Sequence, residues 1–202
     1  HPPLGRPDQG GLLRRAPARE TAHRGTGILR LSVLGVVLTL AASGCGDEDT
    51  AVSDPALNEQ LIAAAYENDV EAARRLMEQG ADVNAKDETV QSAYLVATSE
   101  VGDDPSLLEL ALANGADVSS LDSYDGTGLI RAADRGYTEV VARLLETDID
   151  VDHVNRLGWT ALLEAIILGG GDAAHTEVVR LLTEAGADVN IADSQGVTPL
   201  AH

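Results

Sequence analysis

Three aspartates at alternate positions form the pattern in this sequence that comes nearest to a metal-binding motif. Asp148, Asp150 and Asp152 have the spacing with which an EF-hand calcium loop begins. Such a loop also needs glycine at its sixth position and a bidentate glutamate at its twelfth. His153 and Trp159 occupy those two positions. We therefore predict a solvated turn here rather than a calcium site.

Other patterns that could carry chemistry are weaker. The glycines at 169–171 are followed by an acid, whereas a phosphate-binding loop needs Lys and then Ser or Thr. His153, His175 and His202 lack the spacing of zinc ligands. We predict no catalytic residue, no metal and no cofactor, and so a protein that is not an enzyme. An enzyme with an unrecognised site in the inserted loops is kept as an alternative.

The single cysteine, Cys45, follows an apolar segment. Residues 31–42 are nearly all apolar and basic residues precede them, which is typical of a signal peptide. The segment is shorter than the roughly 20 residues that span a bilayer as a helix. The ending Ala-Ser-Gly-Cys resembles the lipobox of bacterial lipoproteins, although that family usually has Leu, Val or Ile where Ala42 stands. The resemblance implies a lipidated Cys45 that anchors the protein to the membrane outside the cytoplasm. Ordinary secretion, with cleavage nearby, is the alternative.

The N-terminal part is therefore divided into a signal region, residues 1–44, and an acidic linker, residues 45–56. The chain begins with His1 and has no methionine before Met77, and residues 1–25 are rich in Pro, Gly and Arg. We expect residues 1–25 to be spurious upstream sequence.

The charge is distributed unevenly. Six of the 14 Lys and Arg but only two of the 33 Asp and Glu lie before residue 45. The remainder carries 8 basic and 31 acidic residues, a formal charge of −23. Because such a surface repels phosphates, nucleic-acid binding is not expected, and a basic protein partner is favoured.

One phrase recurs after the linker. Its copies begin at Gly80, Gly115, Asp148 and Gly186, and the first reads Gly-Ala-Asp-Val-Asn. The starts are 35, 33 and 38 residues apart. A period near 33 residues is the length of one ankyrin repeat, a turn followed by two helices. Aromatic residues make up only 2% of the chain, and a core of Ala, Leu and Val suits closely stacked small helices.

A second phrase recurs in the same units. It reads Thr-Pro-Leu at 198–200, Thr-Ala-Leu at 160–162 and Thr-Gly-Leu at 127–129, with Glu-Val-Val at 139–141 and 177–179. The sequence thus resembles the ankyrin-repeat family over residues 57–202. The resemblance implies an all-α repeat solenoid, an ankyrin stack of helix-turn-helix units with β-hairpin fingers. We delimit the repeats as 57–86, 87–121, 122–154, 155–192 and a truncated 193–202.

Several departures from the repeat pattern predict local differences. Gly80, Gly115 and Gly186 should end second helices in the left-handed conformation, which Asp148 adopts less readily. The links at 99–105 and 169–175 are longer than in the family. Since the fifth repeat is incomplete, we expect the apolar face of the fourth to lack its cover. That face comprises Leu162, Ile166, Val179 and Leu182.

Binding is expected on the finger tips and the exposed side of the first helices, as the resemblance implies. The finger positions are 88, 89 and 91, then 123, 124 and 126, then 156, 157 and 159, then 194, 195 and 197. We expect the partner to contact Tyr124, Arg131, Arg156, Leu157, Trp159 and Glu164. Trp159 is the expected anchor, since Trp, Tyr and Arg dominate binding energies, and its packing against a neighbouring finger is the alternative.

These observations predict a monomeric, membrane-tethered, extracytoplasmic ankyrin-repeat protein that binds an unidentified protein partner. The alternative is a secreted or periplasmic ankyrin protein that supports an enzyme such as catalase in oxidative-stress defence.

Overall fold

The computed structural model describes residues 53–202, and this part contains eight α-helices and a short 3₁₀ helix. The first repeat holds α1 (Pro55–Tyr66) and α2 (Val70–Glu78), and the second holds α3 (Ala93–Ser99) and α4 (Ser106–Ala113). The third holds α5 (Gly128–Arg135) and α6 (Thr138–Leu145), and the fourth α7 (Ala161–Gly169) and α8 (Ala173–Glu184). The 3₁₀ helix η1 (Pro199–Ala201) follows. The predicted all-α repeat solenoid is confirmed.

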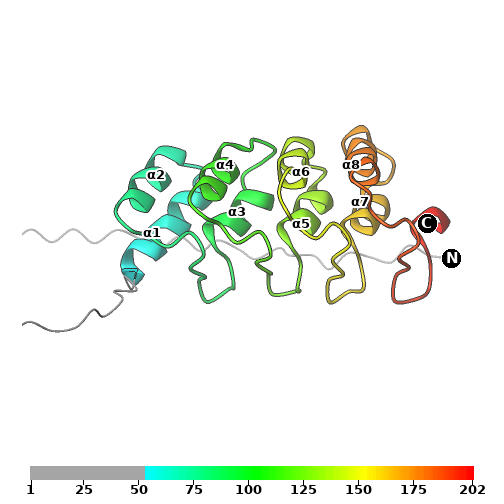
Figure 1. Ribbon diagram of the computed structural model, residues 1–202, viewed down its shortest axis with the longest axis horizontal. Coiled ribbons are helices and arrows are strands. Elements are labelled where there is room, and N and C mark those ends of the chain that lie inside the picture. Colours follow the sequence, from blue (N-terminus) through cyan, green and yellow to red (C-terminus); the bar gives the residue numbers. More distant parts are fainter. Residues whose placement is uncertain (1–52) are drawn as a thin grey trace, which may run out of the picture. The chain divides into compact units, whose positions relative to one another are not determined.

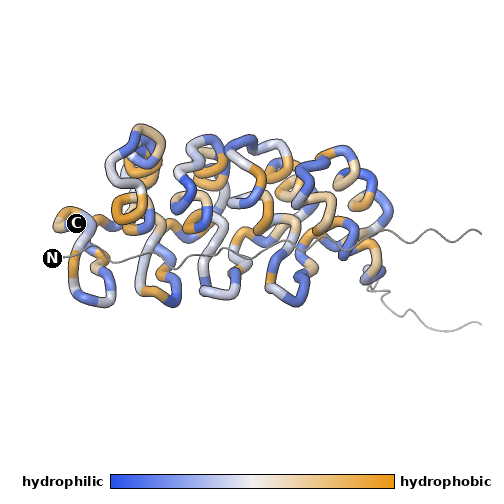
Figure 2. Tube along the Cα trace, turned by 180° about the vertical axis from the view of Figure 1, so that it is seen from behind, coloured by the Kyte–Doolittle hydropathy of each residue, from blue (hydrophilic) through white to orange (hydrophobic). Residues whose placement is uncertain are grey.

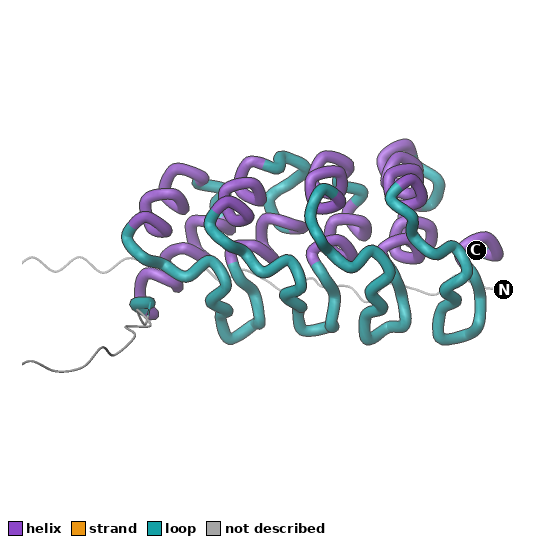
Figure 3. The backbone as a smooth tube through the Cα atoms, in the orientation of Figure 1, coloured by secondary structure: helices purple, strands orange, loops and turns teal. Residues whose placement is uncertain are grey.

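The helices form two rows (Figure 1). The first helices α1, α3, α5 and α7 contact one another in sequence, and each also packs against the second helix of its own repeat. Long loops extend from the row of first helices, and all of them lie on the same side of that row (Figure 3). Their tips are largely hydrophilic, whereas hydrophobic residues gather where helices meet (Figure 2).

The helix α1 begins at Pro55, two residues before the predicted repeat boundary. The side chain of Asp54 accepts a hydrogen bond from the backbone N–H of Ala56 at 2.9 Å and caps the helix. Pro55 is suited to the first turn, where its missing N–H costs nothing. The signal region and Cys45 lie outside the described residues. Within residues 53–202, none of the helices is both long and apolar enough to cross a bilayer.

The second and third repeats both depart from the Thr-Pro-Leu phrase, and the two departures are complementary in size. Tyr94, in the second repeat, is completely buried and donates a hydrogen bond from its hydroxyl to the carbonyl of Val118. Its hydroxyl lies only 2.5 Å from where a Cβ would stand on Gly128, in the third repeat. Since no real Cβ approaches an oxygen so closely, the large ring in one repeat requires the glycine in the next.

The loops at 87–91, 122–126, 155–159 and 193–197, called fingers below, contain no strand in the described structure. The predicted β-hairpins are wrong in that respect. Each finger is closed by two backbone hydrogen bonds, one from the first residue's N–H to the fifth residue's carbonyl at 2.9 to 3.0 Å and one from the fourth residue's N–H to the first residue's carbonyl at 2.9 to 3.1 Å. These bonds form a turn, and they are too few to form the ladder of a sheet.

The second helices of the first, second and fourth repeats are followed by a left-handed glycine, and that of the third repeat is not. Gly80, Gly115 and Gly186 have φ of +99°, +81° and +93°, which confirms their left-handed conformation. Asp148, which was expected to adopt that conformation less readily, has no positive φ. Instead, Thr147 donates hydrogen bonds from its N–H and its hydroxyl to the carbonyl of Leu144, and the chain leaves the helix there.

The longer link of the second repeat caps a helix of the third. Asp103 accepts hydrogen bonds from the backbone N–H groups of Thr138, Glu139 and Val140 at 2.9 to 3.1 Å, and from the Thr138 hydroxyl. The helix α6 has no side-chain cap of its own. The inserted residues therefore supply the negative charge that a helix N-terminus favours.

The link of the fourth repeat is shorter than predicted, because α7 continues to Gly169 and α8 begins at Ala173. His175 orders it. Its ring nitrogens lie within hydrogen-bond distance of two acceptors, the Asp172 carboxylate at 2.9 Å and the Asp134 carbonyl at 3.1 Å. A Cβ on Gly169 would collide with His175. The fourth repeat is thereby fastened to the third.

The apolar face of the fourth repeat is better covered than expected. Leu162 and Leu182 are buried, and only Ile166 and Val179 are half-buried. The correction has a structural reason, since η1 packs against α7 and its Pro199 is buried.

Val90 is strained at the fourth position of the first finger. This position is left-handed in all four fingers, with φ of +65° at Val90, +57° at Asp125, +84° at Gly158 and +81° at Gly196. A β-branched residue rarely adopts this conformation, and such strain costs on the order of 1–3 kcal/mol.

We predict that Val90→Gly raises the free energy of unfolding by about 1 kcal/mol, part of the gain being offset by glycine's entropy in the unfolded chain. Urea unfolding followed by circular dichroism measures it. The reciprocal Gly196→Val should destabilise, since space around Gly196 is open and only the backbone conformation is at issue. A Val90→Gly chain less stable than the unchanged protein would contradict this explanation.

Candidate functional site

The first residue of each finger fixes the loop through its side chain. One oxygen accepts two backbone hydrogen bonds, from the residues two and four positions later, at 2.8 to 3.0 Å. The accepting residues are Asp87, Asp122, Asn155 and Asp193. In the third and fourth repeats these bonds set the backbone of Tyr124, Leu157 and Trp159. The side chains expected to bind a partner thus stand on rigid loops.

In the last three fingers, the first residue also contacts the side chain nine positions later. Asp122 pairs with Arg131 at 2.9 Å, and Asn155 donates to the Glu164 carboxylate at 2.9 Å. In the last finger, Asp193 contacts His202 at 3.1 Å. Equivalent positions of successive repeats therefore carry a cation, an anion and an imidazole.

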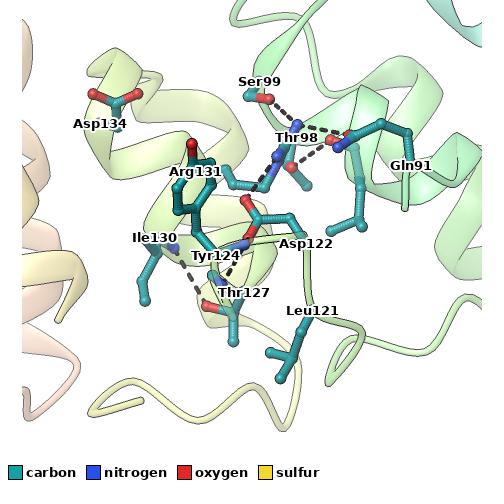
Figure 4. Close-up of polar contacts among 12 residues, drawn as sticks. Gln91, Thr98, Ser99, Leu121, Asp122, Tyr124, Thr127, Ile130, Arg131 and Asp134 are labelled. Carbon is teal, nitrogen blue, oxygen red and sulfur yellow. Dashed lines mark hydrogen bonds and ion pairs between the residues drawn. The ribbon is translucent and has the colours of Figure 1, made fainter. Parts of the chain in front are cut away.

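Arg131 fastens the third repeat to the second (Figure 4). Its Nη1 donates to Asp122, while Nη2 donates to Ser99 at 2.6 Å, to Gln91 at 3.0 Å and to Glu100 at 3.3 Å. Only 12% of its side chain is exposed, and its Nε is buried without a partner in residues 53–202. The expectation of an exposed contact residue is corrected, because polar groups of the neighbouring repeat enclose the guanidinium.

Glu164 is also less accessible than expected, with 6% of the residue exposed. Burial is the main reason why the pKa of its carboxyl is raised to about 7; the nearby carboxylates of Asp134 and Asp122 also raise the pKa, and the hydrogen bond from Asn155 lowers it. Its Oε1 accepts the Asn155 bond, and Oε2 accepts none from residues 53–202. The glutamate is therefore a buried carboxyl with one oxygen left for another donor.

A groove of about 350 Å³ lies between the third and fourth repeats, beside Arg131 and Glu164. We call it the aromatic groove, and its lining brings together five of the six predicted binding residues, Tyr124, Arg131, Leu157, Trp159 and Glu164. Tyr124 is 61% and Leu157 51% exposed, and Trp159 is half-buried. Figure 4 shows the Tyr124 ring beside α5, on the side where Arg131 and Asp134 stand.

Arg156 is the predicted residue that does not line the groove. Its guanidinium pairs with both oxygens of Asp125 on the preceding finger, at 3.0 and 3.1 Å, and its backbone N–H donates to the carbonyl of Tyr124 at 2.9 Å. The pair is exposed, so its own contribution to stability is small. It joins the two fingers that carry Tyr124 and Leu157.

Sequence reasoning missed the remaining lining residues. Apart from Gly126, a predicted finger position, they are Ser99, Glu100, Asp122, Ile130, Asp134, Arg135, Asn155 and Leu168. Most follow the exposed side of α5 or the finger bases, and their periodicity on the first helices was the available signal. Leu168 had no such signal, because its exposure depends on where α7 ends.

The histidines make structural contacts. His153 bonds through Nε2 to the Asp125 carbonyl at 2.7 Å, and His175 and His202 contact carboxylates as described. Residues 53–202 hold no group of three His, Cys, Asp or Glu side chains arranged for a metal ion. Asp150 instead accepts the backbone N–H of Asp152, as in a solvated turn.

Family comparisons agree with the repeat pattern. Residues 94–193 match the family model described as ankyrin repeats in three copies, and residues 61–88 match the single ankyrin repeat. The chain is similar to the crystal structure of an ankyrin repeat domain from Acinetobacter baumannii AYE. The identity is 48%, the TM-score 0.66, and the match covers 70% of this chain and 71% of that one.

Two curated relatives are similar over most of the repeat region. The ankyrin repeat protein YahD of Escherichia coli K12 is 37% identical over 126 residues, which are 62% of each chain. The human ankyrin repeat and SOCS box protein 6 is 34% identical over 131 residues, 63% of this chain and 31% of that protein. This chain therefore spans less than two thirds of the length of these relatives.

We predict that Glu164 makes stability depend on pH. A carboxyl whose pKa is raised on folding contributes stability below its unfolded pKa of 4.5, and that contribution is lost as the pH rises through about 7. Glu164→Gln keeps the acceptor for Asn155 and cannot ionise. Between pH 5 and pH 8, the free energy of unfolding of the unchanged protein should therefore fall by on the order of 2 kcal/mol relative to that of the variant.

Urea unfolding at several pH values tests this. Glu177→Gln is the control, because hydrogen bonds from Arg180 lower the pKa of Glu177 below 4.5, so its effect on stability should not vary between pH 5 and pH 8. If Glu164→Gln tracked the unchanged protein from pH 5 to 8, the carboxyl would not be the buried group described.

Proposed function

Because the chain belongs to the ankyrin-repeat family, whose members are in general binding scaffolds rather than enzymes, we propose that it binds a protein partner through the aromatic groove. The observation that carries the proposal is the placing of Tyr124, Leu157 and Trp159 around one concavity. Tyr124 and Leu157 are exposed and Trp159 is half-buried, in a chain that has one Trp and four Tyr in 202 residues.

The groove offers the features of a binding centre. Hot spots of protein interfaces are enriched in Trp, Tyr and Arg and lie in pockets from which water is excluded on binding. The aromatic groove combines such side chains with aliphatic ones, Leu157 and Leu168. A partner that fills it would bury apolar surface at the centre and leave the charged finger tips at the rim.

The rigidity of the fingers favours affinity. Association costs free energy for every side chain or loop that must be ordered. Here the side-chain oxygens of Asp122 and Asn155 and the Arg156–Asp125 pair already fix both fingers. Binding should therefore proceed with little loss of conformational entropy.

The charge of the repeat region indicates the kind of partner. With a formal charge of −23 from residue 45 onward, the surface should attract a basic protein and accelerate association at low salt. Nucleic acid does not fit this surface, because both carry the same charge.

We predict that Trp159→Ala weakens partner binding about tenfold or more, since a desolvated anchor costs on the order of 2 kcal/mol when truncated. The partner would be recovered by affinity capture from membranes, purified, and its affinity measured by calorimetry. Val154→Ala is the matched control, because Val154 is exposed in the loop before the same finger and does not line the groove.

Circular dichroism separates the two roles of Trp159. A Trp159→Ala chain that keeps its fold and loses the partner supports the proposal. A chain that unfolds, or that binds as tightly as the control, would show that the docking surface lies elsewhere.

We further propose that the repeats are tethered outside the cytoplasm through a lipid on Cys45. The support is the apolar run at 31–42 that ends in Ala-Ser-Gly-Cys, followed by an acidic linker. Acylation with two or more chains would anchor the protein firmly, since each buried CH₂ contributes about 0.8 kcal/mol and one chain alone is marginal. The linker would then hold the groove away from the membrane surface.

We predict that the protein expressed in a bacterial host partitions into detergent and carries acyl mass on an N-terminal cysteine, and that Cys45→Ser abolishes both. Phase partitioning and mass spectrometry of the mature N-terminus measure this. A water-soluble product without acyl mass, or one cleaved away from Cys45, would favour ordinary secretion.

A further inference from the structure

Resting on the proposed function, we propose that the aromatic groove recognises an arginine side chain of the partner, which pairs with Glu164 while its guanidinium plane lies against Trp159 and Tyr124. The inference names the chemistry that the groove selects, and it starts from the carboxylate at its base.

Glu164 has capacity for one more donor. Its Oε1 is engaged by Asn155 at 2.9 Å, and its Oε2 accepts no hydrogen bond from residues 53–202. The Oε2 atom keeps contact with solvent, since it is not among the atoms of residues 53–202 that are buried without a partner, but the carboxyl as a whole is largely desolvated, which makes its ionised form costly. A cationic donor from outside would satisfy the second oxygen and offset that cost, so the groove favours a ligand with positive charge.

The surrounding charges reinforce this preference. Four carboxylates and two guanidinium groups line the groove. The charge of Arg131 is taken up by Asp122 at 2.9 Å and Glu100 at 3.3 Å, and that of Arg135 by Asp134 at 3.8 Å. The ionised form of Glu164 therefore gives the groove an excess of negative charge.

The aromatic walls favour arginine over a simple point charge. The planar guanidinium stacks on aromatic faces and is more weakly hydrated than an ammonium group. Trp159 and Tyr124 stand on neighbouring fingers at the same groove, with Leu157 and Leu168 beside them. Apolar walls of this kind also suit the methylene stem of a long basic side chain.

Binding of arginine should release a proton near neutral pH. The pKa of Glu164 is about 7 because of burial, and a cation binds only its ionised form well. The ionisable groups that share the groove are Glu100, Asp122, Arg131, Asp134 and Arg135. The helices α8 and η1 also pack against α7, but their nearby histidines, His175 and His202, do not line the groove.

The test uses the full chain and two acetylated, amidated tripeptides, Gly-Arg-Gly and its neutral counterpart with citrulline. Trp159 is the protein's one tryptophan, so its fluorescence reports on the groove directly. At constant ionic strength the arginine peptide should give a saturable change and the citrulline peptide none. Affinity should be about tenfold higher at pH 8 than at pH 6, following the ionised fraction of Glu164.

Glu164→Gln should weaken the arginine peptide and remove the pH dependence, and Glu177→Gln on α8 should change neither. Circular dichroism of each variant confirms that it is folded. Equal binding of the citrulline peptide, no saturable change with the arginine peptide, or a pH dependence that survives in Glu164→Gln would overturn the inference. A partner that loses affinity for Trp159→Ala but not for Glu164→Gln would overturn it while leaving the proposed function intact.

Discussion

The arrangement of this protein depends on one short-range interaction, the hydrogen bonds that the first side chain of each finger accepts from its own loop. Asp122 and Asn155 each hold two backbone N–H groups and also reach the first helix nine residues later. A loop without a strand ladder has few other means of becoming rigid. Because both fingers are fixed in this way, the groove between them is preformed, and the side chains that line it come from loops and helices locked to each other.

The contacts that fasten one repeat to the next are those in which the repeats differ. Arg131 reaches back to the second repeat, His175 reaches from the fourth to the third, and Asp103 caps a helix of its neighbour. In a solenoid, stability is the sum of repeat and nearest-neighbour terms. Individual substitutions at these positions therefore act locally, on one interface, rather than on the whole stack.

The recurring phrases were enough to predict the fold and five of the residues that line the groove, because period and turn residues are local properties of a sequence. What the sequence could not reveal were relations between repeats. Tyr94 and Gly128 each look like a simple departure from the Thr-Pro-Leu phrase. Only their contact in the structure shows that the large ring requires the glycine. Likewise, the sequence could not show that the guanidinium of Arg131 is enclosed by polar atoms of the preceding repeat, 32 residues away in sequence at Ser99.

The contrast between Arg131 and Glu164 shows how one architectural position can serve two purposes. Both stand nine residues after a finger side chain and contact it. Arg131 has four hydrogen-bond partners, so its positive charge is compensated within the protein. Glu164 has one, and its carboxyl is desolvated, which destabilises the ionised form. A buried group left partly unsatisfied lowers stability unless a ligand completes it. In a repeat stack that cost falls on the interfaces of one repeat, so the fourth repeat can hold an incomplete carboxylate at the base of a groove while its neighbours keep the fold.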